Sequence, residues 1–194
     1  YRGMGRLWVM EQQPGPVNWA KYNPIPLKGA VRLWSWEAFA HDAEVVSYFR
    51  WRQAPYAQEQ MHAGLMYRDN TPAPGQEEAQ QVSEEIEKIE MPATEQSPIA
   101  LVHDYEACWM TELDGQTHDF HYTRLLLDFY KAVRMNGGSL DIVGKNADFT
   151  GYKLVIIPSL VHFQEEDLQR VIKSGAQILA GPRTGVKTPD FQLP

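Results

Sequence analysis

The sequence predicts an α/β fold built on parallel sheets. Short apolar runs, such as LWVM at residues 7–10 and KLVII at residues 153–157, have the composition of buried strands. Segments with apolar residues at helical spacing separate these runs along the chain. Strands that alternate with helices need crossover connections, and such connections produce parallel pairing.

The overall composition limits the class of protein. The chain has 194 residues, 43% of them apolar, so we expect one large domain or parts of two rather than a disordered segment. Its net charge of −7 argues against a nucleic-acid binder, which usually carries a basic stripe. A single cysteine, Cys108, excludes an internal disulfide framework and a multi-cysteine zinc cluster. No apolar run approaches the roughly 18 residues of a membrane span.

The first part of the chain reads as strand, loop, helix, strand, loop and helix. Leu7–Met10 is a buried strand by type, and a turn-rich loop beginning QQPGP follows Glu11. We expect a helix over Leu27–Ala43 and a second apolar strand over Glu44–Trp51.

A carboxylate stands at the end of the first strand. Catalytic residues of a β/α barrel stand at such strand ends, on the carboxyl face of the barrel. Glu11 is therefore a candidate catalytic residue, because an unpaired charge beside LWVM is otherwise costly. The alternative is a helix cap or a member of an ion pair.

Tryptophan is concentrated near the start of the chain. Such crowding suits a cleft that stacks flat ligands such as sugar rings, and the alternative is an aromatic core. Five of the six tryptophans lie in residues 1–51: Trp8, Trp19, Trp34, Trp36 and Trp51.

A domain boundary is expected near residues 92–98. The sequence EEAQQVSEEIEKIE predicts an acidic helix with one narrow apolar face, formed by Val82, Ile86 and Ile89. Met91-Pro92 ends this helix, and a short polar connector follows. We therefore divide the chain into residues 1–91, a linker at 92–97, and residues 98–194.

The last part of the chain alternates strands and helices. Helices are expected over Asp119–Met135, which ends at Gly137-Gly138, and over Gln164–Lys173, which ends at Gly175. The four expected strands are Ile99–His103, Leu140–Val143, Lys153–Ile157 and Gln177–Leu179.

Several segments resemble the β-galactosidases of glycoside hydrolase family 42. The segments MEQQPG, YFRWRQAP and EQMHAG carry the resemblance over residues 7–66. DYEACWM, GYKLVIIPSL and GPRTGVK resemble the trimerisation domain of the same family more weakly. The resemblance implies the last two β/α units of a (β/α)8 TIM barrel, followed by the first part of an α/β, glutamine-amidotransferase-like trimerisation domain. It covers about the whole chain but only part of the family's length.

The resemblance also implies site residues. It makes Glu11 the nucleophile of a retaining β-galactosidase, and Trp19, Glu59 and His62 its substrate-binding residues in this chain. The acid/base Glu of the family lies in an Asn-Glu pair after the fourth barrel strand. It has no counterpart here, because the chain begins at about the seventh strand.

The residues themselves leave several roles open. Arg50 and Arg52 alternate along one strand and point the same way, so one of them could reach Glu11 or pair with a helix acid outside the barrel. Glu59 and His62 are three residues apart, so a helical turn would place both on one side. Without the resemblance, that pair would be a surface contact. No third ligand lies near it in sequence, so no metal is expected, and no cofactor is expected in this chain.

The second part has a competing enzymatic interpretation. Its order of elements resembles the class I glutamine amidotransferases, which place a cysteine nucleophile on a tight turn. The matching turn here reads GPRTG at residues 181–185 and holds neither cysteine nor serine, while Cys108 has no nearby base in sequence. His41 and His162 are expected to be ordinary surface histidines, and Trp109 an interface or core aromatic.

The sequence therefore predicts part of a β-galactosidase that cleaves terminal β-D-galactosides with retention. Expected partners are the galactoside, the rest of the same enzyme and two further copies in a homotrimer, without nucleic acid or membrane. The chain opens with Tyr1 and shows no signal peptide, so we expect a piece of a longer, cytoplasmic protein. The alternative is a non-catalytic α/β assembly module, with the isolated chain inactive.

Overall fold

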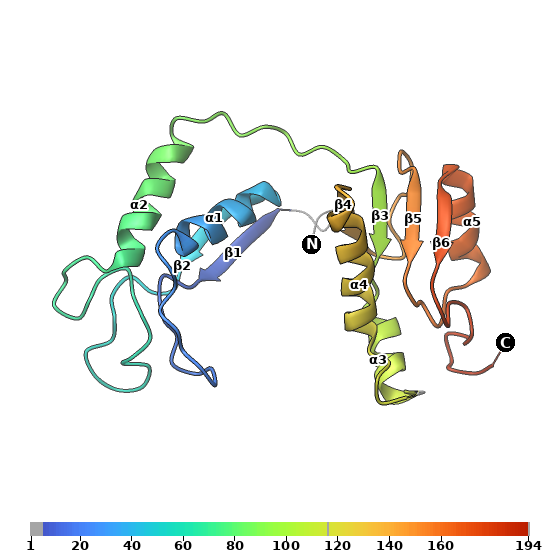
Figure 1. The fold of residues 1–194 in the computed structure, drawn as a ribbon, viewed down its shortest axis with the longest axis horizontal. Helices are drawn as coiled ribbons and strands as arrows, with labels where there is room; N and C mark the ends of the chain where they lie inside the picture. Colours follow the sequence, from blue (N-terminus) through green and yellow to red (C-terminus); the bar gives the residue numbers. More distant parts are fainter. Residues whose placement is uncertain (1–5, 116, 194) are drawn as a thin grey trace. The chain divides into compact units, whose positions relative to one another are not determined.

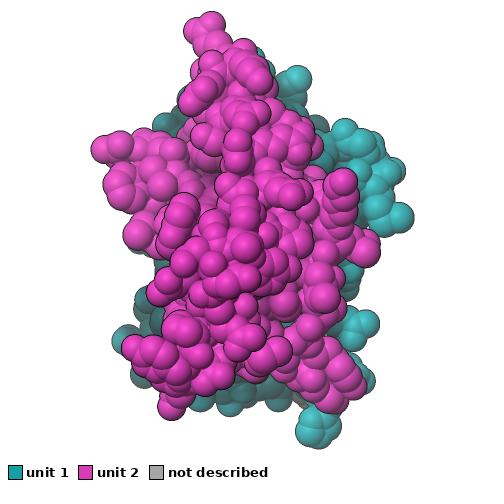
Figure 2. Space-filling model, turned by 90° about the vertical axis from the view of Figure 1, so that its left-hand side faces the viewer, with its two compact units in different colours: residues 1–3, 95–194 teal, residues 4–94 magenta. Residues whose placement is uncertain are grey.

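A computed structural model describes residues 6–115 and 117–193 of the chain. Two compact units divide the chain, one ending at Thr94 and the other beginning at Glu95. We call them the N-terminal unit and the C-terminal unit, and Figure 2 colours them separately. In the described part of the chain, no helix combines the length and apolar character that crossing a membrane requires.

The N-terminal unit has the predicted order of two strands and two helices. These are β1 (Leu7–Gln12), α1 (Ala30–Ala40), β2 (Ala43–Tyr48) and α2 (Pro74–Ile86) (Figure 1). β1 and β2 pair in parallel, with Leu7 opposite Ala43 and Gln12 opposite Tyr48.

Helix α1 is shorter than predicted at both ends. Gly29 precedes it with a φ of 91°, a left-handed conformation that cannot continue an α-helix, so α1 begins at Ala30 rather than Leu27. At the other end Asp42 also has a positive φ of 72°, which separates α1 from β2. Strand β2 ends at Tyr48, so Arg50 and Arg52 lie beyond it rather than on it.

A carboxylate joins the two helices of the N-terminal unit. Glu85 on α2 accepts hydrogen bonds from Arg32 Nε at 2.9 Å and from the indole Nε1 of Trp36 at 2.7 Å, both on α1. These bonds hold the pKa of Glu85 below its ordinary value, the hydrogen bond from Arg32 being the largest cause.

The C-terminal unit contains one four-stranded parallel sheet in the order β4-β3-β5-β6. Its strands are β3 (Ile99–Val102), β4 (Leu140–Val143), β5 (Leu154–Ile157) and β6 (Gln177–Ala180), and its helices flank the sheet (Figure 1). The predicted α/β class with parallel sheets is therefore confirmed. The chain places β4 on one side of β3 and then crosses to the other side for β5.

Three helices connect these strands: α3 (Tyr105–Leu113), α4 (Tyr122–Met135) and α5 (Glu165–Ser174). The sequence did not predict α3, although Asp104 caps it by accepting a hydrogen bond from Ala107 N at 3.3 Å. Helix α5 begins with a reciprocal capping box between Gln164 and Asp167 and ends at left-handed Gly175.

The core of the C-terminal unit lies between the sheet and its helices. Ala107 from α3, Tyr122 from α4 and Val171 from α5 are all buried against the strands. The strand residues Ala100, Val102, Val155 and Ile157 belong to the same cluster. The burial of β3 and β5 thus explains why short continuous apolar runs, without alternation, marked these two strands in the sequence.

Candidate functional site

The carboxyl ends of β1 and β2 meet at one edge of their sheet, because the two strands run parallel. Backbone hydrogen bonds join the segment that follows β1 to the segment that follows β2. Phe49 N donates to Gln12 O at 3.1 Å, and Ala63 N donates to Pro16 O at 2.9 Å. The loops at residues 13–29 and 49–73 are therefore held against each other.

Glu11 lies at this edge, inside strand β1 rather than after it. Its side chain is exposed, and its carboxylate has no hydrogen bond or ion pair with any described residue. The pairing register shifts between Val9 and Gln12, so the ladder is irregular at Glu11. Such irregularities redirect side chains at the rims of barrels and next to active sites.

Glu59 lies in the loop after β2 and has its own counter-ion. Arg50 Nη2 lies 3.2 Å from Glu59 Oε2, and the guanidinium of Arg50 lies 4.8 Å from the centre of the Phe49 ring. Arg52 instead donates to Asn70 Oδ1 at 3.0 Å. Of the two arginines, Arg50 is thus the one that contacts a candidate site residue, and that residue is Glu59.

His62 is buried in the same loop, with 3% of its surface exposed. Its ring meets the Phe49 ring edge to face, with ring centres 5.2 Å apart. Its backbone N donates to Glu59 O at 3.0 Å, in a turn rather than the expected helical turn. The ring atom Nδ1 is buried and has no hydrogen-bond partner among the described residues.

Trp19 lies on the loop after β1, with 72% of its surface exposed. An exposed indole offers a flat apolar face, although it has no contact with Glu59 or His62 that the structure defines. Phe49 is the residue that sequence reasoning missed. It bonds to the residue after Glu11 and contacts both Arg50 and His62. Its position inside YFRW, at the end of an apolar strand, was the available signal.

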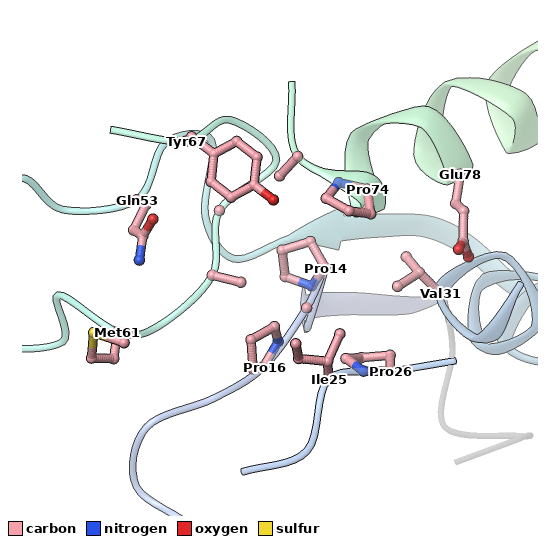
Figure 3. Close-up of a pocket in the computed structure, with 15 residues that line it drawn as sticks. Pro14, Pro16, Ile25, Pro26, Val31, Gln53, Met61, Tyr67, Pro74 and Glu78 are labelled. Carbon is pink, nitrogen blue, oxygen red and sulfur yellow. The ribbon is translucent and has the colours of Figure 1, made fainter. Parts of the chain in front are cut away.

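An apolar pocket of about 250 Å³ lies between these two loops, which supply most of its lining. Figure 3 shows its residues, among them Pro14, Pro16, Ile25 and Tyr67, and none of the four candidate site residues lines it. The wall is close-packed at Gly75, where a Cβ would lie 1.9 Å from Pro14 O. The start of α2 therefore touches the loop after β1 directly.

A second polar cluster lies in the C-terminal unit. His162 is 3% exposed, so the prediction of a surface histidine was wrong, whereas His41 is exposed as predicted. His162 contacts Asp104 and Glu106, and Lys145 contacts the same group. The hydrogen bond from Lys145 lowers the pKa of Glu106. Burial opposes the charge on Lys145, but Glu106 and Asp104 raise its pKa overall.

Two family models match successive parts of the chain. A family model described as "Beta-galactosidase" matches residues 1–89, and one described as "Beta-galactosidase trimerisation domain" matches residues 97–194. A beta-galactosidase of Thermus thermophilus is 52% identical over the whole chain, and Beta-galactosidase Bga of Halorubrum lacusprofundi is 43% identical over 96% of it. The chain spans only 30% and 27% of these two relatives.

Solved structures show the same fold over nearly the whole chain. The beta-galactosidase of the psychrophilic Marinomonas ef1 matches with a TM-score of 0.92 and 46% identity, over 98% of this chain and 30% of that one. The beta-galactosidase of the Antarctic haloarchaeon Halorubrum lacusprofundi matches with a TM-score of 0.91 and 41% identity, over 97% and 29%.

Proposed function

The chain belongs to glycoside hydrolase family 42, and from that premise we propose that the protein carrying it is a retaining β-galactosidase whose active site this chain helps to form. The N-terminal unit is part of the family's α/β barrel, and the C-terminal unit is part of its trimerisation domain. The acid/base carboxyl group lies outside this chain.

The observation that carries the proposal is the free carboxylate of Glu11 at the carboxyl edge of β1. Retaining hydrolysis needs one ionised carboxylate and one protonated carboxyl group about 5–5.5 Å apart. Glu11 attacks the anomeric carbon, and the aglycone leaves with the proton of the acid. Water, deprotonated by the same acid/base group, then cleaves the galactosyl ester and restores Glu11. Exposure and the lack of a partner among the described residues leave the carboxylate of Glu11 available for this attack.

The other three residues bind the galactose unit. Trp19 presents its exposed ring to the C–H face of the sugar. The Glu59 carboxylate accepts hydrogen bonds from sugar hydroxyls, and Arg50 Nη2, 3.2 Å from Glu59 Oε2, holds that carboxylate in place. The buried Nδ1 of His62 lacks a protein partner among the described residues, so a sugar hydroxyl would satisfy it.

The test replaces Glu11 by Gln in the intact protein. We expect turnover of a β-galactoside to fall at least about a thousandfold, because the nucleophile is lost. Added azide should restore turnover in Glu11→Ala, whose truncated side chain leaves room for the anion, and should give the α-galactosyl azide, with inverted configuration. The control Glu37→Gln changes an exposed carboxylate on α1 and should leave turnover unchanged. Normal turnover in Glu11→Gln would refute the assignment.

A non-catalytic assembly role is the second candidate for the isolated chain. The match of residues 97–194 to a trimerisation domain favours it, since such a domain joins subunits. We propose that the whole protein is a homotrimer, which sedimentation of the intact protein would test. The cytoplasmic location stays a prediction.

A further inference from the structure

The polar cluster of the C-terminal unit lies where the strand order reverses, because the chain adds β4 on one side of β3 and β5 on the other. Asp104 follows β3, Lys145 follows the neighbouring β4, and His162 follows β5 on the other side of β3. Open α/β sheets bind their ligands outside the carboxyl ends of the strands, at such switch points. Its position in the fold therefore singles out this cluster before any side-chain geometry is considered.

One nitrogen of His162 is at the centre of the cluster. His162 Nε2 lies 3.1 Å from Asp104 Oδ2 and 3.1 Å from Glu106 Oε2. The three ligand atoms lie within 4.8 Å of one another. Two ligands that are each about 2.1 Å from a tetrahedral metal lie about 3.4 Å apart, so this spacing suits a bound cation.

Lys145 already brings a positive charge to the same place. Its Nζ lies 2.9 Å from Glu106 Oε2 and 3.7 Å from Asp104 Oδ2, and it is also hydrogen bonded to His162 Nε2. The single Nε2 cannot accept from Lys145 and donate to the two carboxylates at once. A cation coordinated by all three ligand atoms removes this conflict.

Three of the four side chains in this cluster are largely buried, and the fourth, Glu106, is 59% exposed. The side chains of His162, Asp104 and Lys145 are 4%, 15% and 18% exposed. Nδ1 of His162 is buried without a partner among the described residues, so the contacts of Nε2 are the polar contacts that orient the ring. A pocket lined by Glu106, Lys145 and His162, with Trp109 and Met110, gives access from solvent.

We propose that Asp104, Glu106 and His162 form a binding site for a divalent cation, in which the ammonium group of Lys145 holds the cation's place until a metal displaces it. One imidazole nitrogen and two carboxylate oxygens suit Zn²⁺ and the neighbouring Co²⁺. The fourth position opens onto the pocket and takes water. The proposal does not depend on the galactosidase activity, because it uses only residues of the C-terminal unit.

The experiment measures Zn²⁺ binding to the metal-depleted intact protein, by competition with a chromophoric chelator. The variants are His162→Gln, Lys145→Met, Lys145→Met with His162→Gln, and the control Lys131→Met, which removes an exposed charge on α4. We expect wild type to bind Zn²⁺ weakly at this site. Lys145→Met should bind it at least about tenfold more tightly, since a competing positive charge is gone. Lys131→Met should match wild type.

Adding His162→Gln to Lys145→Met must abolish the tighter Zn²⁺ binding. The proposal is overturned if wild type binds no Zn²⁺ that His162→Gln abolishes, if Lys145→Met binds Zn²⁺ no better than Lys131→Met, or if Lys145→Met binds it equally well with His162→Gln. Thermal unfolding gives a second measurement. Zn²⁺ should raise the melting temperature of Lys145→Met and leave that of the double variant unchanged, and Lys145→Gln repeats the test with another side chain. No galactosidase assay enters the readout, so failure of the proposed function would not affect it.

Discussion

The guanidinium of Arg50 lies 3.2 Å from the carboxylate of Glu59, so the loop after β2 brings its own counter-ion to a candidate sugar-binding residue. The same guanidinium lies over the Phe49 ring, and the Phe49 ring packs edge to face against His62, the second candidate residue of this loop. We therefore expect Arg50 to act through Glu59 as a positioning residue.

Replacing Arg50 by Met should raise KM for a β-galactoside about fivefold with kcat less affected, as expected for the loss of about 1 kcal/mol from a partly exposed pair. Steady-state kinetics of the intact protein measure this split. Arg52→Met is the matched control, because Arg52 bonds to Asn70 instead. Equal effects of the two variants would contradict the positioning role.

Replacing Trp19 by Ala should weaken sugar binding by about 1–2 kcal/mol, because the stacking face is lost. This loss corresponds to a five- to thirtyfold higher dissociation constant for galactose, by order of magnitude. Trp19→Phe keeps an aromatic face and should recover most of the affinity. Calorimetric titration of both variants decides the matter, and unchanged binding in Trp19→Ala would remove this residue from the site.

Replacing Glu85 by Gln should lower the melting temperature at neutral pH, because Arg32 and Trp36 lose their charged acceptor. The pKa of Glu85 in the folded protein is lowered from 4.5. The ionised Glu85 carboxylate therefore stabilises the folded protein above pH 4.5, and this stabilisation is lost as the pH falls through the lower pKa of the folded state. The difference from wild type should shrink in that acid range. Glu84→Gln, an exposed neighbour bonded to Gln80, should behave like wild type.

The 194-residue chain expressed alone should be inactive on β-galactosides and poorly soluble or oligomeric. In the described part of the N-terminal unit, β1 and β2 form a two-stranded sheet, whose outer edges are open to pairing. Trp8 and Met10 on β1 are 49% and 66% exposed. Size-exclusion chromatography with a galactoside assay tests this, and an active, well-behaved monomer would refute it.

Strands were easier to predict than the contacts between them. β4 has the predicted bounds, because a short run rich in β-branched residues, between the Gly137-Gly138 turn and Gly144, indicates a strand even where it is only partly buried. Helix α3 was missed, although Asp104 and Glu106 are a typical helix start. Nine residues with apolar and polar side chains mixed around the axis give little periodicity to detect.

Glu11 and the cluster around His162 show why functional sites are harder to predict from sequence than helices and strands. Glu11 was singled out by local sequence, since a charge directly after LWVM is anomalous wherever the chain goes. His162 was not, because its partners Asp104, Glu106 and Lys145 follow different strands. They meet only through the order β4-β3-β5, which no local pattern specifies.

The contact at Gly75 has a consequence for exchanging loops among related enzymes. Any side chain at this position would collide with Pro14 O. The loop after β1 and the first turn of α2 therefore pack so closely that the shape of one constrains the other. A graft that imports one of these segments without the other would introduce a steric mismatch, even if every residue around the sugar were preserved. Chimaeras that exchange either segment should therefore transfer both together and retain glycine at position 75.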